Sequence, residues 1–425
     1  MFEWNYCPSA HLPKIARIDQ EFDNASIANI DAHIASECKR TDVAGMLKPG
    51  AKVALAVGSR GIGKIDSIVS ALVSQLKEIG AHPFIVPAMG SHGGATAEGQ
   101  RAVLESYNIT EQTVGAPVRS SMEVVNLGEV EPGIPVFVDK IAATEADAII
   151  PVARVKPHTV FRGPIESGLH KMLCIGLGKQ HGAERLHACS VDRFSTLIPA
   201  EGQFIMKRLP VVFGLAIVEN AFEMPLHIEI VKADDFLWRE KELLLLAQDL
   251  MPRIPVNALD LLVIKEIGKN ISGSGMDPNV TGRYCSTAAE DGPLILQRIV
   301  ILDLSELTHG NATGIGMSDV VTRKAVQKID FHATYMNSLT SSRLERPKIP
   351  MVAATDKDAV SIGIETCTNV DKSKIRVAFI ENTLKLESFY ASEGLLAELQ
   401  AHKNVVSCGD LIDIPFDGKG DLALF

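Results

Sequence analysis

The chain has 425 residues, of which 46% are hydrophobic and 22% are charged, a globular composition long enough for more than one domain. The 42 basic and 52 acidic side chains give a net charge of −10, which disfavours nucleic acid as a partner. No apolar run approaches the ~20 residues of a membrane span, so we expect no membrane partner. The seven scattered cysteines form no C-x-x-C pair, and the first residues do not resemble a signal peptide. Both features favour the cytoplasm.

The first clear structural pattern begins at residue 52. An apolar, β-branched run over residues 52–57 predicts a strand, and apolar residues recur at helical spacing over 65–79. A second strand is expected at 83–86, followed by a Gly-rich turn at 89–94 and a helix from Thr96. This alternation is typical of a wound α/β sheet, in which ligands bind at the carboxyl ends of the strands.

The same pattern continues to the end of the chain. The sequence predicts further strands at 146–152, 211–218, 261–264, 299–302, 350–353 and 375–380, and helices at 236–250, near Glu166, from about Ser318 and at 393–402. The segment 251–255 (MPRIP) or the Gly- and Asn-rich segment 268–283 marks a boundary. We therefore expect two α/β domains with Rossmann-like wound sheets, residues 1–265 and 266–425, and an active site in the cleft between them.

The loop after the first strand reads GSRGIGK. Its spacing is that of a phosphate-binding loop, but Ile65 stands where a magnesium-binding Ser or Thr is required, so a nucleoside triphosphatase is not expected. Ser59 and Arg60 are nevertheless placed to contact a phosphate or a carboxylate. For this loop alone, a plain tight turn with a solvated Arg is the favoured interpretation.

A histidine follows the second predicted strand within Gly90–Gly94. His92 lies one βα unit after Arg60, so both are expected at the same edge of the sheet, where a histidine can act as an acid or a base. A single loop histidine is more often incidental.

The segment 154–189 is rich in basic residues and histidines. Four of the chain's twelve histidines lie in it, beside several Lys and Arg: His158, His170, His181, His187, Lys156, Arg162, Lys171, Lys179 and Arg185. A focused positive field suits an anionic substrate or cofactor. A zinc site is the rival interpretation, although H-x5-H lacks the i, i+4 register. The third interpretation is a surface helix with scattered charges and no binding role.

Two further loops are dense in Gly and Asn, residues 270–283 and 309–316. Such loops allow positive φ angles or the close approach of a ligand, or they simply connect domains. Arg283 is the residue of the first loop that can clamp a carboxylate.

The order and spacing of these residues resemble the nickel-dependent lactate racemase superfamily of 2-hydroxyacid racemases and epimerases, over most of the chain. The resemblance rests on residues of the expected types that follow one another at the expected intervals: Arg60, His92, His158, Lys171 and His187. It implies that His92 and His158 are the acid/base pair. It further implies that Lys171 carries a nickel-pincer nucleotide covalently and that His187 ligates the nickel.

The chemistry of the family explains this set of residues. The C2–H of a hydroxycarboxylate is a very weak acid, so its hydrogen leaves more easily as hydride, and the cofactor accepts it. Two bases on separate segments then serve the substrate hydroxyl from opposite sides. Ser59 is expected near the cofactor, and Arg60 and Arg283 near the substrate carboxylate. Val57 replaces the Asp usual in the family, which implies a divergent member with a substrate other than lactate.

We thus predict an isomerase, a 2-hydroxyacid racemase or epimerase. The alternatives are a metal-dependent hydrolase or lyase using His158, His181 and His187, and a non-catalytic protein that binds a sugar acid or a nucleotide. The expected partners are a small 2-hydroxyacid and cofactor-maturation enzymes, and the chain is a possible homo-oligomer.

Overall fold

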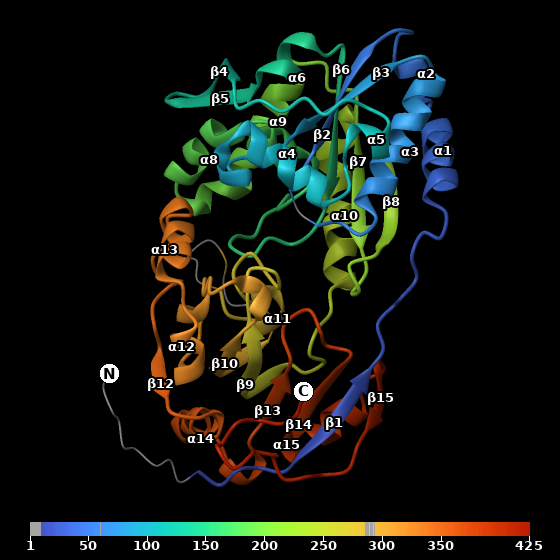
Figure 1. Cartoon of the computed structure of the whole chain (residues 1–425). Helices are drawn as coiled ribbons and strands as arrows, with labels where there is room; N and C mark the ends of the chain where they lie inside the picture. The colour runs from blue at the N-terminus through green and yellow to red at the C-terminus, as the bar shows by residue number, and fades with distance from the viewer. Residues whose placement is uncertain (1–9, 60, 285–288, 290–291, 293) are drawn as a thin grey trace. The chain divides into compact units, whose positions relative to one another are not determined.

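The structure is a computed structural model of the chain, and it describes residues 10–59, 61–284, 289, 292 and 294–425 (Figure 1). The chain forms two compact units. One is Asp23–Met251, and the other joins Met1–Phe22 to Pro252–Phe425. Both are built on sheets with parallel strands, so the α/β expectation is confirmed.

The unit Asp23–Met251 contains a five-stranded sheet with the order β3-β2-β6-β7-β8. The first four strands are parallel and β8 is antiparallel to β7. The strands are β2 (Lys52–Val57), β3 (His82–Pro87), β6 (Ala148–Arg154), β7 (Phe213–Glu219) and β8 (Pro225–Lys232). The apolar runs of β2, β6 and β7 are buried almost throughout, as expected for parallel strands covered on both faces.

Helices cover both faces of this sheet. On β7, alternate residues such as Leu215 pack into a core with α1 (Ile30–Thr41) and α3 (Ile65–Glu78). Gly214 points to the opposite face, because a Cβ there would meet Leu169 and Phe236 at 2.6–2.9 Å. Leu169 begins α7 (Leu169–Lys171) and Phe236 begins α10 (Phe236–Leu250), so these helices lie on that second face.

The remaining elements of this unit surround the sheet. They are α2 (Val43–Met46), η1 (Gly93–Ala95), α4 (Ala97–Ser106), α5 (Glu111–Val114), the hairpin β4 (Val124–Glu131) and β5 (Ile134–Asp139), α6 (Lys140–Glu145), a π-helical turn (Met172–Gly176), α8 (Lys179–Ala188), η3 (Val191–Arg193), α9 (Phe194–Met206) and η4 (Ala233–Asp235). The side chain of Thr96 caps α4, which confirms the helix expected there.

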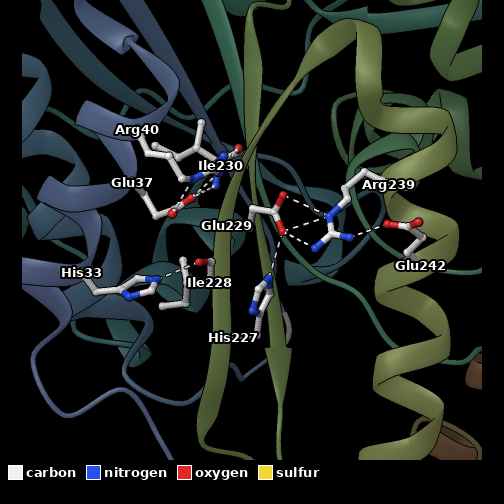
Figure 2. A network of polar contacts seen from close by, with 9 residues as sticks. All are labelled: His33, Glu37, Arg40, His227, Ile228, Glu229, Ile230, Arg239 and Glu242. Atoms are coloured by element: carbon white, nitrogen blue, oxygen red, sulfur yellow. Dashed lines mark hydrogen bonds and ion pairs between the residues drawn. The ribbon is translucent and has the colours of Figure 1, made fainter.

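A polar network fastens the edge strand β8 to helices on both sides (Figure 2). Glu229 on β8 accepts hydrogen bonds from Arg239 on α10, at 2.7–3.0 Å, and from His227 at 3.0 Å. Glu37 on α1 accepts one from the Ile230 backbone N–H, also at 3.0 Å. Burial raises the pKa of Glu229, but the hydrogen bonds from His227 and Arg239 outweigh burial and lower the pKa to about 2.

The second unit contains an eight-stranded sheet with the order β12-β11-β10-β9-β13-β14-β1-β15. Its strands are β9 (Ala258–Ile267), β10 (Ile295–Leu304), β11 (Val320–Thr322), β12 (Met351–Ala353), β13 (Val377–Ile380), β14 (Ser388–Ser392), β1 (Ile15–Gln20) and β15 (Val405–Cys408). Strands β12 to β13 of this order are parallel, and β14 and β1 pair antiparallel.

The helices of this unit are short to medium in length. They are α11 (Pro278–Thr281), η5 (Glu306–Thr308), η6 (Ile315–Met317), α12 (Arg323–Gln327), α13 (Phe331–Thr340), α14 (Asp356–Thr366), η7 (Lys372–Lys374) and α15 (Glu393–Gln400). A helix was expected from about Ser318, but residues 320–322 first add the strand β11 to the sheet, and the helix begins only at Arg323.

The observed division of the chain differs from the expected one at residue 265. Strand β9, which that boundary would cut, pairs with β10 on one side and β13 on the other, so it lies at the centre of the second sheet. The N-terminal strand β1 also belongs there, because it pairs with β14 and β15. The division after Met251 coincides with the MPRIP segment.

The two Gly-rich loops of the second unit pack against each other. A Cβ on Gly275 would lie 1.9 Å from the carbonyl oxygen of Thr313, and one on Gly314 would lie 1.9 Å from that of Ser274. Both glycines have positive φ angles. The close approach that the sequence indicated is therefore between two backbone segments of the chain itself.

None of the helices in the described part of the chain combines the length and the apolar character that a bilayer crossing requires.

Candidate active site at the carboxyl edge of the first sheet

The strand order of the first unit defines where a ligand is expected to bind. The chain passes from β2 to β3 on one side and then places β6 on the other side of β2, so the order reverses between β2 and β6. In wound sheets the carboxyl ends at such a reversal form the usual ligand site. Ser59 follows β2, His92 follows β3 and His158 follows β6, so all three lie at this edge. Arg60 lies outside the described residues.

His92 and Ser59 are hydrogen-bonded to each other, although they follow different strands. The Ser59 hydroxyl contacts Nδ1 of the His92 ring, and the Tyr107 hydroxyl donates to the Ser59 carbonyl oxygen at 2.6 Å. His92 is exposed. The contact with Ser59 holds the ring at Nδ1, and a histidine ring can exchange a proton near neutral pH.

A buried polar cluster supports the loop that carries His92. Gln100 donates to the carbonyl oxygens of Gly90, at 2.8 Å, and His92, at 3.3 Å. The ammonium of Lys179 donates to Gln100 at 3.0 Å and pairs with Asp139 at 3.2 Å. All three side chains are fully buried. Burial lowers the pKa of Lys179 and raises that of Asp139, and each opposes the other's shift by its charge.

The His158 loop is organised around the buried carboxylate of Glu166. Glu166 accepts hydrogen bonds from the backbone N–H of His158 at 2.7 Å, from Arg162 at 2.9 Å and from the N–H of Gly163 at 3.2 Å. Burial raises its pKa, and the charge of Arg162 and these bonds act in the opposite direction. The helix expected near Glu166 therefore begins only at Leu169, because Glu166 fills the loop instead.

A row of aromatic rings connects His158 with His187. The centroids of the His158 and Phe161 rings are 4.6 Å apart, and those of the Phe161 and Phe194 rings are 5.6 Å apart. The centroid of the Phe194 ring lies 5.9 Å from that of the His187 ring. The two histidines belong to separate segments of the sequence and thus border one aromatic cluster formed with α8 and α9.

Lys171 is held on a short helical segment that packs onto the same edge. A Cβ on Gly58, after β2, would meet Met172 at 2.9 Å, and one on Gly176 would meet the Ala88 carbonyl, after β3, at 2.8 Å. At Gly176 the obstacle is backbone, so only glycine lets the π-helical turn approach the end of β3, whereas at Gly58 it is the end of the flexible Met172 side chain. Such turns are frequent at functional sites. The Lys171 side chain is partly exposed.

A carboxylate from α10 anchors the start of this segment. Glu240 accepts from the backbone N–H of Leu169, from the N–H of His170 at 3.2 Å and from Nδ1 of the His170 ring. His170 is fully buried, and its ring packs on Gly202 of α9. His170 thus has a structural position that explains its place beside Lys171.

Helix α8 presents its two histidines in different directions. The H-x5-H spacing of His181 and His187 separates them by about 240° around a helix. His181 packs against Phe137 of β5 at 5.7 Å, whereas His187 faces Phe194. Between them Arg185 forms an almost fully buried ion pair with Glu201 of α9.

The basic residues of segment 154–189 are largely paired with acidic ones. Four ion pairs lie around the edge, Arg154–Glu219, Arg162–Glu166, Lys179–Asp139 and Arg185–Glu201. The carboxylates are nearly or completely buried, whereas the sequence pattern alone pointed to a positive field. The local field is consequently much weaker than the count of basic residues indicates.

Arg283 occupies a structural position in the other unit. Its guanidinium donates to Asp319 at 2.6 Å and to the carbonyl oxygens of Met317, at 3.1 Å, and Gln297, at 2.8 Å. In this structure the carboxylate that Arg283 binds is therefore that of Asp319.

Sequence reasoning missed the buried and partly buried residues that support these groups. Tyr107, Gln100, Glu166 and Glu240 all contact a candidate residue or its backbone, and none belongs to a recognisable motif. Glu240 lies 70 residues from His170, so no local pattern connects the two. One available signal was an acidic residue at an otherwise apolar helix position, because Glu240 shares the buried face of α10 with Phe236, Leu243 and Leu244.

Comparison with known proteins assigns the first half of the chain. Residues 9–195 match the family described as the lactate racemase N-terminal domain. This segment, somewhat less than half of the chain, is therefore similar to the N-terminal domain of lactate racemase. No curated protein matches the chain by sequence.

Two solved structures are similar over most of the chain. The lactate racemase apoprotein from Thermoanaerobacterium thermosaccharolyticum has 14% sequence identity and a TM-score of 0.50, with 87% of this chain and 99% of that chain covered. A Thermotoga maritima protein has 13% identity and a TM-score of 0.48, with 81% and 92% covered. At such identities the first likeness shows the fold. Together with the family assignment, it points to a racemase-type function.

Proposed function

We propose that the chain is an isomerase that racemises or epimerises a 2-hydroxyacid by moving the C2 hydrogen as hydride. The observation that carries this proposal is the arrangement of His92, His158 and the Lys171 segment at one edge of the first sheet. Their order along the chain resembles that of the lactate racemase superfamily, whose N-terminal domain matches residues 9–195.

The residues around Lys171 fit the covalent cofactor that is associated with this superfamily. Lys171 is partly exposed and sits on a segment fixed by Glu240 at one end and by close packing on two strand ends at the other. His187 is exposed, so its ring is accessible to a metal that is bound at this edge. Near Lys171, Arg185 Nε and Nη1 are buried without a hydrogen-bond partner in the described structure, a donor set suited to an anionic group. We propose that Lys171 holds a nickel-pincer nucleotide and that His187 ligates its metal.

When bound, that cofactor supplies an electrophilic carbon that accepts and returns hydride. The chain's own residues would accept the proton of the substrate hydroxyl and donate it back. His92, held by Ser59 at Nδ1, takes or gives this proton at Nε2 on one side. His158, whose backbone is fixed by Glu166, takes or gives the proton on the other side. Each enantiomer of the substrate therefore has a base beside its hydroxyl.

A metal-dependent hydrolase or lyase is less well supported. It would need His158, His181 and His187 around one ion, but His181 packs on the β5 side of α8, away from His187. In the residues that the structure describes, no group of three or more His, Cys, Asp or Glu side chains is placed to hold a metal. The non-catalytic binding protein remains the second alternative.

Deuterium at C2 tests the proposal. Protein co-expressed with a pincer-synthesis pathway is given 2-deuterated glycolate, lactate, malate or mandelate in H2O. Hydride transfer predicts that the racemised product keeps the label, and glycolate serves as the achiral control. Racemisation with loss of the label to water would contradict hydride transfer, because it requires removal of C2–H as a proton.

The two histidines are tested on the same loaded protein. His92→Ala and His158→Ala are each expected to lower the racemisation rate by at least about 100-fold, the usual contribution of a general acid or base. His181→Ala, an exposed histidine on α8, is the matched control and should stay within about twofold. Parental activity in either active-site variant would exclude that histidine as an acid or base.

A further inference from the structure

Lys156 lies between two candidate residues at the carboxyl edge of the first sheet. Over residues 154–158 the exposure alternates, with Arg154, Lys156 and His158 partly exposed and Val155 and Pro157 buried. A period of two is that of extended backbone, whose alternate side chains share one face. Lys156 therefore lies on the same face as Arg154 and His158.

This face is directed toward the loop that follows β2. Arg154 donates from Nη1 to the Gly61 carbonyl oxygen at 3.2 Å and pairs with Glu219, which also accepts from the Gly63 N–H at 2.8 Å. Lys156 is the next residue on this face of the chain. Its position is thus beside the reversal of strand order between β2 and β6, where a ligand is expected.

The backbone of Lys156 is fixed by a single serine. The Lys156 N–H donates to the Ser167 hydroxyl at 3.1 Å, and that hydroxyl donates to the Lys156 carbonyl oxygen. Pro157 also restricts Lys156 to extended backbone angles. A lysine held in this way loses less freedom when it binds a ligand than one on a mobile surface loop.

The ammonium of Lys156 differs from its basic neighbours in its surroundings. Within the described residues it makes no ion pair or side-chain hydrogen bond, whereas each of four neighbours holds a carboxylate of the chain: Arg154, Arg162, Lys179 and Arg185. A partly buried cation without a partner is costly unless an anion joins it.

We propose that Lys156 binds the carboxylate of a 2-hydroxycarboxylate and so places the neighbouring hydroxyl near His158. This inference rests on the proposed function for the identity of the ligand. The ion pair would be charge-assisted and partly shielded from water, so it would contribute to ground-state binding more than to the chemical step.

Acetylation footprinting and binding titration test the inference on the full chain without cofactor. The probes are glycolate, lactate, malate and tartronate. Limited acetylation with acetic anhydride, read by mass spectrometry, should show Lys156 protected by at least one probe. Lys64, an exposed lysine at the same edge with no ion pair in the described structure, is the internal control and should react equally with and without probe.

Variants give the second readout. Lys156→Met should weaken binding of the protecting probe at least tenfold, Lys156→Arg should retain most of it, and Lys64→Met should stay within twofold. Failure of every probe to protect Lys156, or unchanged affinity in Lys156→Met, would overturn the inference. If Lys156→Met does not fold, the footprint of the unmodified protein decides.

The cofactor-loaded protein separates this inference from the proposed function. There, Lys156→Met should raise KM for the racemised acid at least tenfold and change kcat less than threefold. Protection of Lys156 without any racemisation would contradict the proposed function and leave the anion site in place. Racemisation with an unchanged KM in Lys156→Met would support the proposed function and contradict the carboxylate site at Lys156.

Discussion

At the residue scale, the candidate site is held by contacts between groups that are far apart in sequence. Ser59 and His92 follow different strands and are joined by one hydrogen bond, and Tyr107 fixes the carbonyl of Ser59. The serine, which the sequence placed near the cofactor, is thus also positioned to orient a histidine. Its hydroxyl would select the imidazole nitrogen that faces a substrate.

Ser59→Ala tests this role. Loss of one hydrogen bond of about 1 kcal/mol should lower the racemisation rate of loaded protein by roughly tenfold or less, and it should change the pH at which the His92 ring titrates. The His92 titration is followed by NMR of its ring protons, which needs no cofactor. Ser91→Ala, in the same loop, is the control, and an unaltered His92 titration in Ser59→Ala would contradict the orienting role.

At the scale of elements, a buried carboxylate and a buried ion pair determine how loops meet the sheet. Glu166 shapes the loop that carries His158, and the Lys179–Asp139 pair joins the start of α8 to the His92 loop through Gln100. Lys179 even adopts a positive φ of 54° to reach this position. Because Lys179 also begins the helix that bears His187, one buried pair links three segments of the candidate site.

Removal of one charge of this pair should be strongly destabilising. Lys179→Met leaves the Asp139 carboxylate buried without its cation, so we expect a loss of about 3–5 kcal/mol in the free energy of unfolding. Lys179→Met combined with Asp139→Leu removes both charges and should recover most of this loss. Urea unfolding of the three variants measures it, and a double variant no more stable than Lys179→Met would argue against an uncompensated charge.

Glu166→Gln tests the loop in the same way. The amide cannot accept the bonds of His158, Gly163 and Arg162 as the carboxylate does, so the loop should open locally, at a cost of about 1–3 kcal/mol. Hydrogen exchange of peptides covering 156–167 should accelerate, while peptides from the second unit should not change. Unaltered exchange in this loop would show that Glu166 does not organise it.

At the scale of the whole molecule, the parallel sheets were predictable and the antiparallel additions were not. The buried runs of β2, β6 and β7 are apolar because both faces are covered, so they stand out in the sequence. Strand β1 does not stand out in the sequence, because its partner β14 lies near the other end of the chain. Ile18 of β1, for example, pairs with Phe389 of β14. Pairing between the two ends of the chain leaves no local signal, so the sequence did not indicate that residues 1–22 join the second unit.

The candidate site was predictable only in part for a related reason. The positions of Ser59, His92 and His158 after apolar strands placed them at one edge. Most of the carboxylates that pair with this segment come from β5, β7, α9 and α10, and only the fold brings them there.

The acid stability of the protein should depend on Glu229. Its pKa of about 2 lies below the ordinary value near 4.5, so it contributes stability that is present above pH 4.5 and is lost as the pH falls toward 2. Glu229→Gln should therefore lower the free energy of unfolding at pH 7 by up to about 3 kcal/mol, and by much less at pH 2. Glu242→Gln, at the exposed end of the same network, should change it by less than about 0.5 kcal/mol. An equal effect of Glu229→Gln at both pH values would contradict this assignment.

The most direct test of the proposed function is the intact mass of the protein together with its metal content, after co-expression with a pincer-synthesis pathway. We expect an added mass that maps to Lys171, one nickel per chain, and loss of both in Lys171→Ala but not in Lys156→Ala. An unmodified chain without nickel, from a host in which a known lactate racemase is loaded, would contradict the proposal and favour the binding-protein alternative.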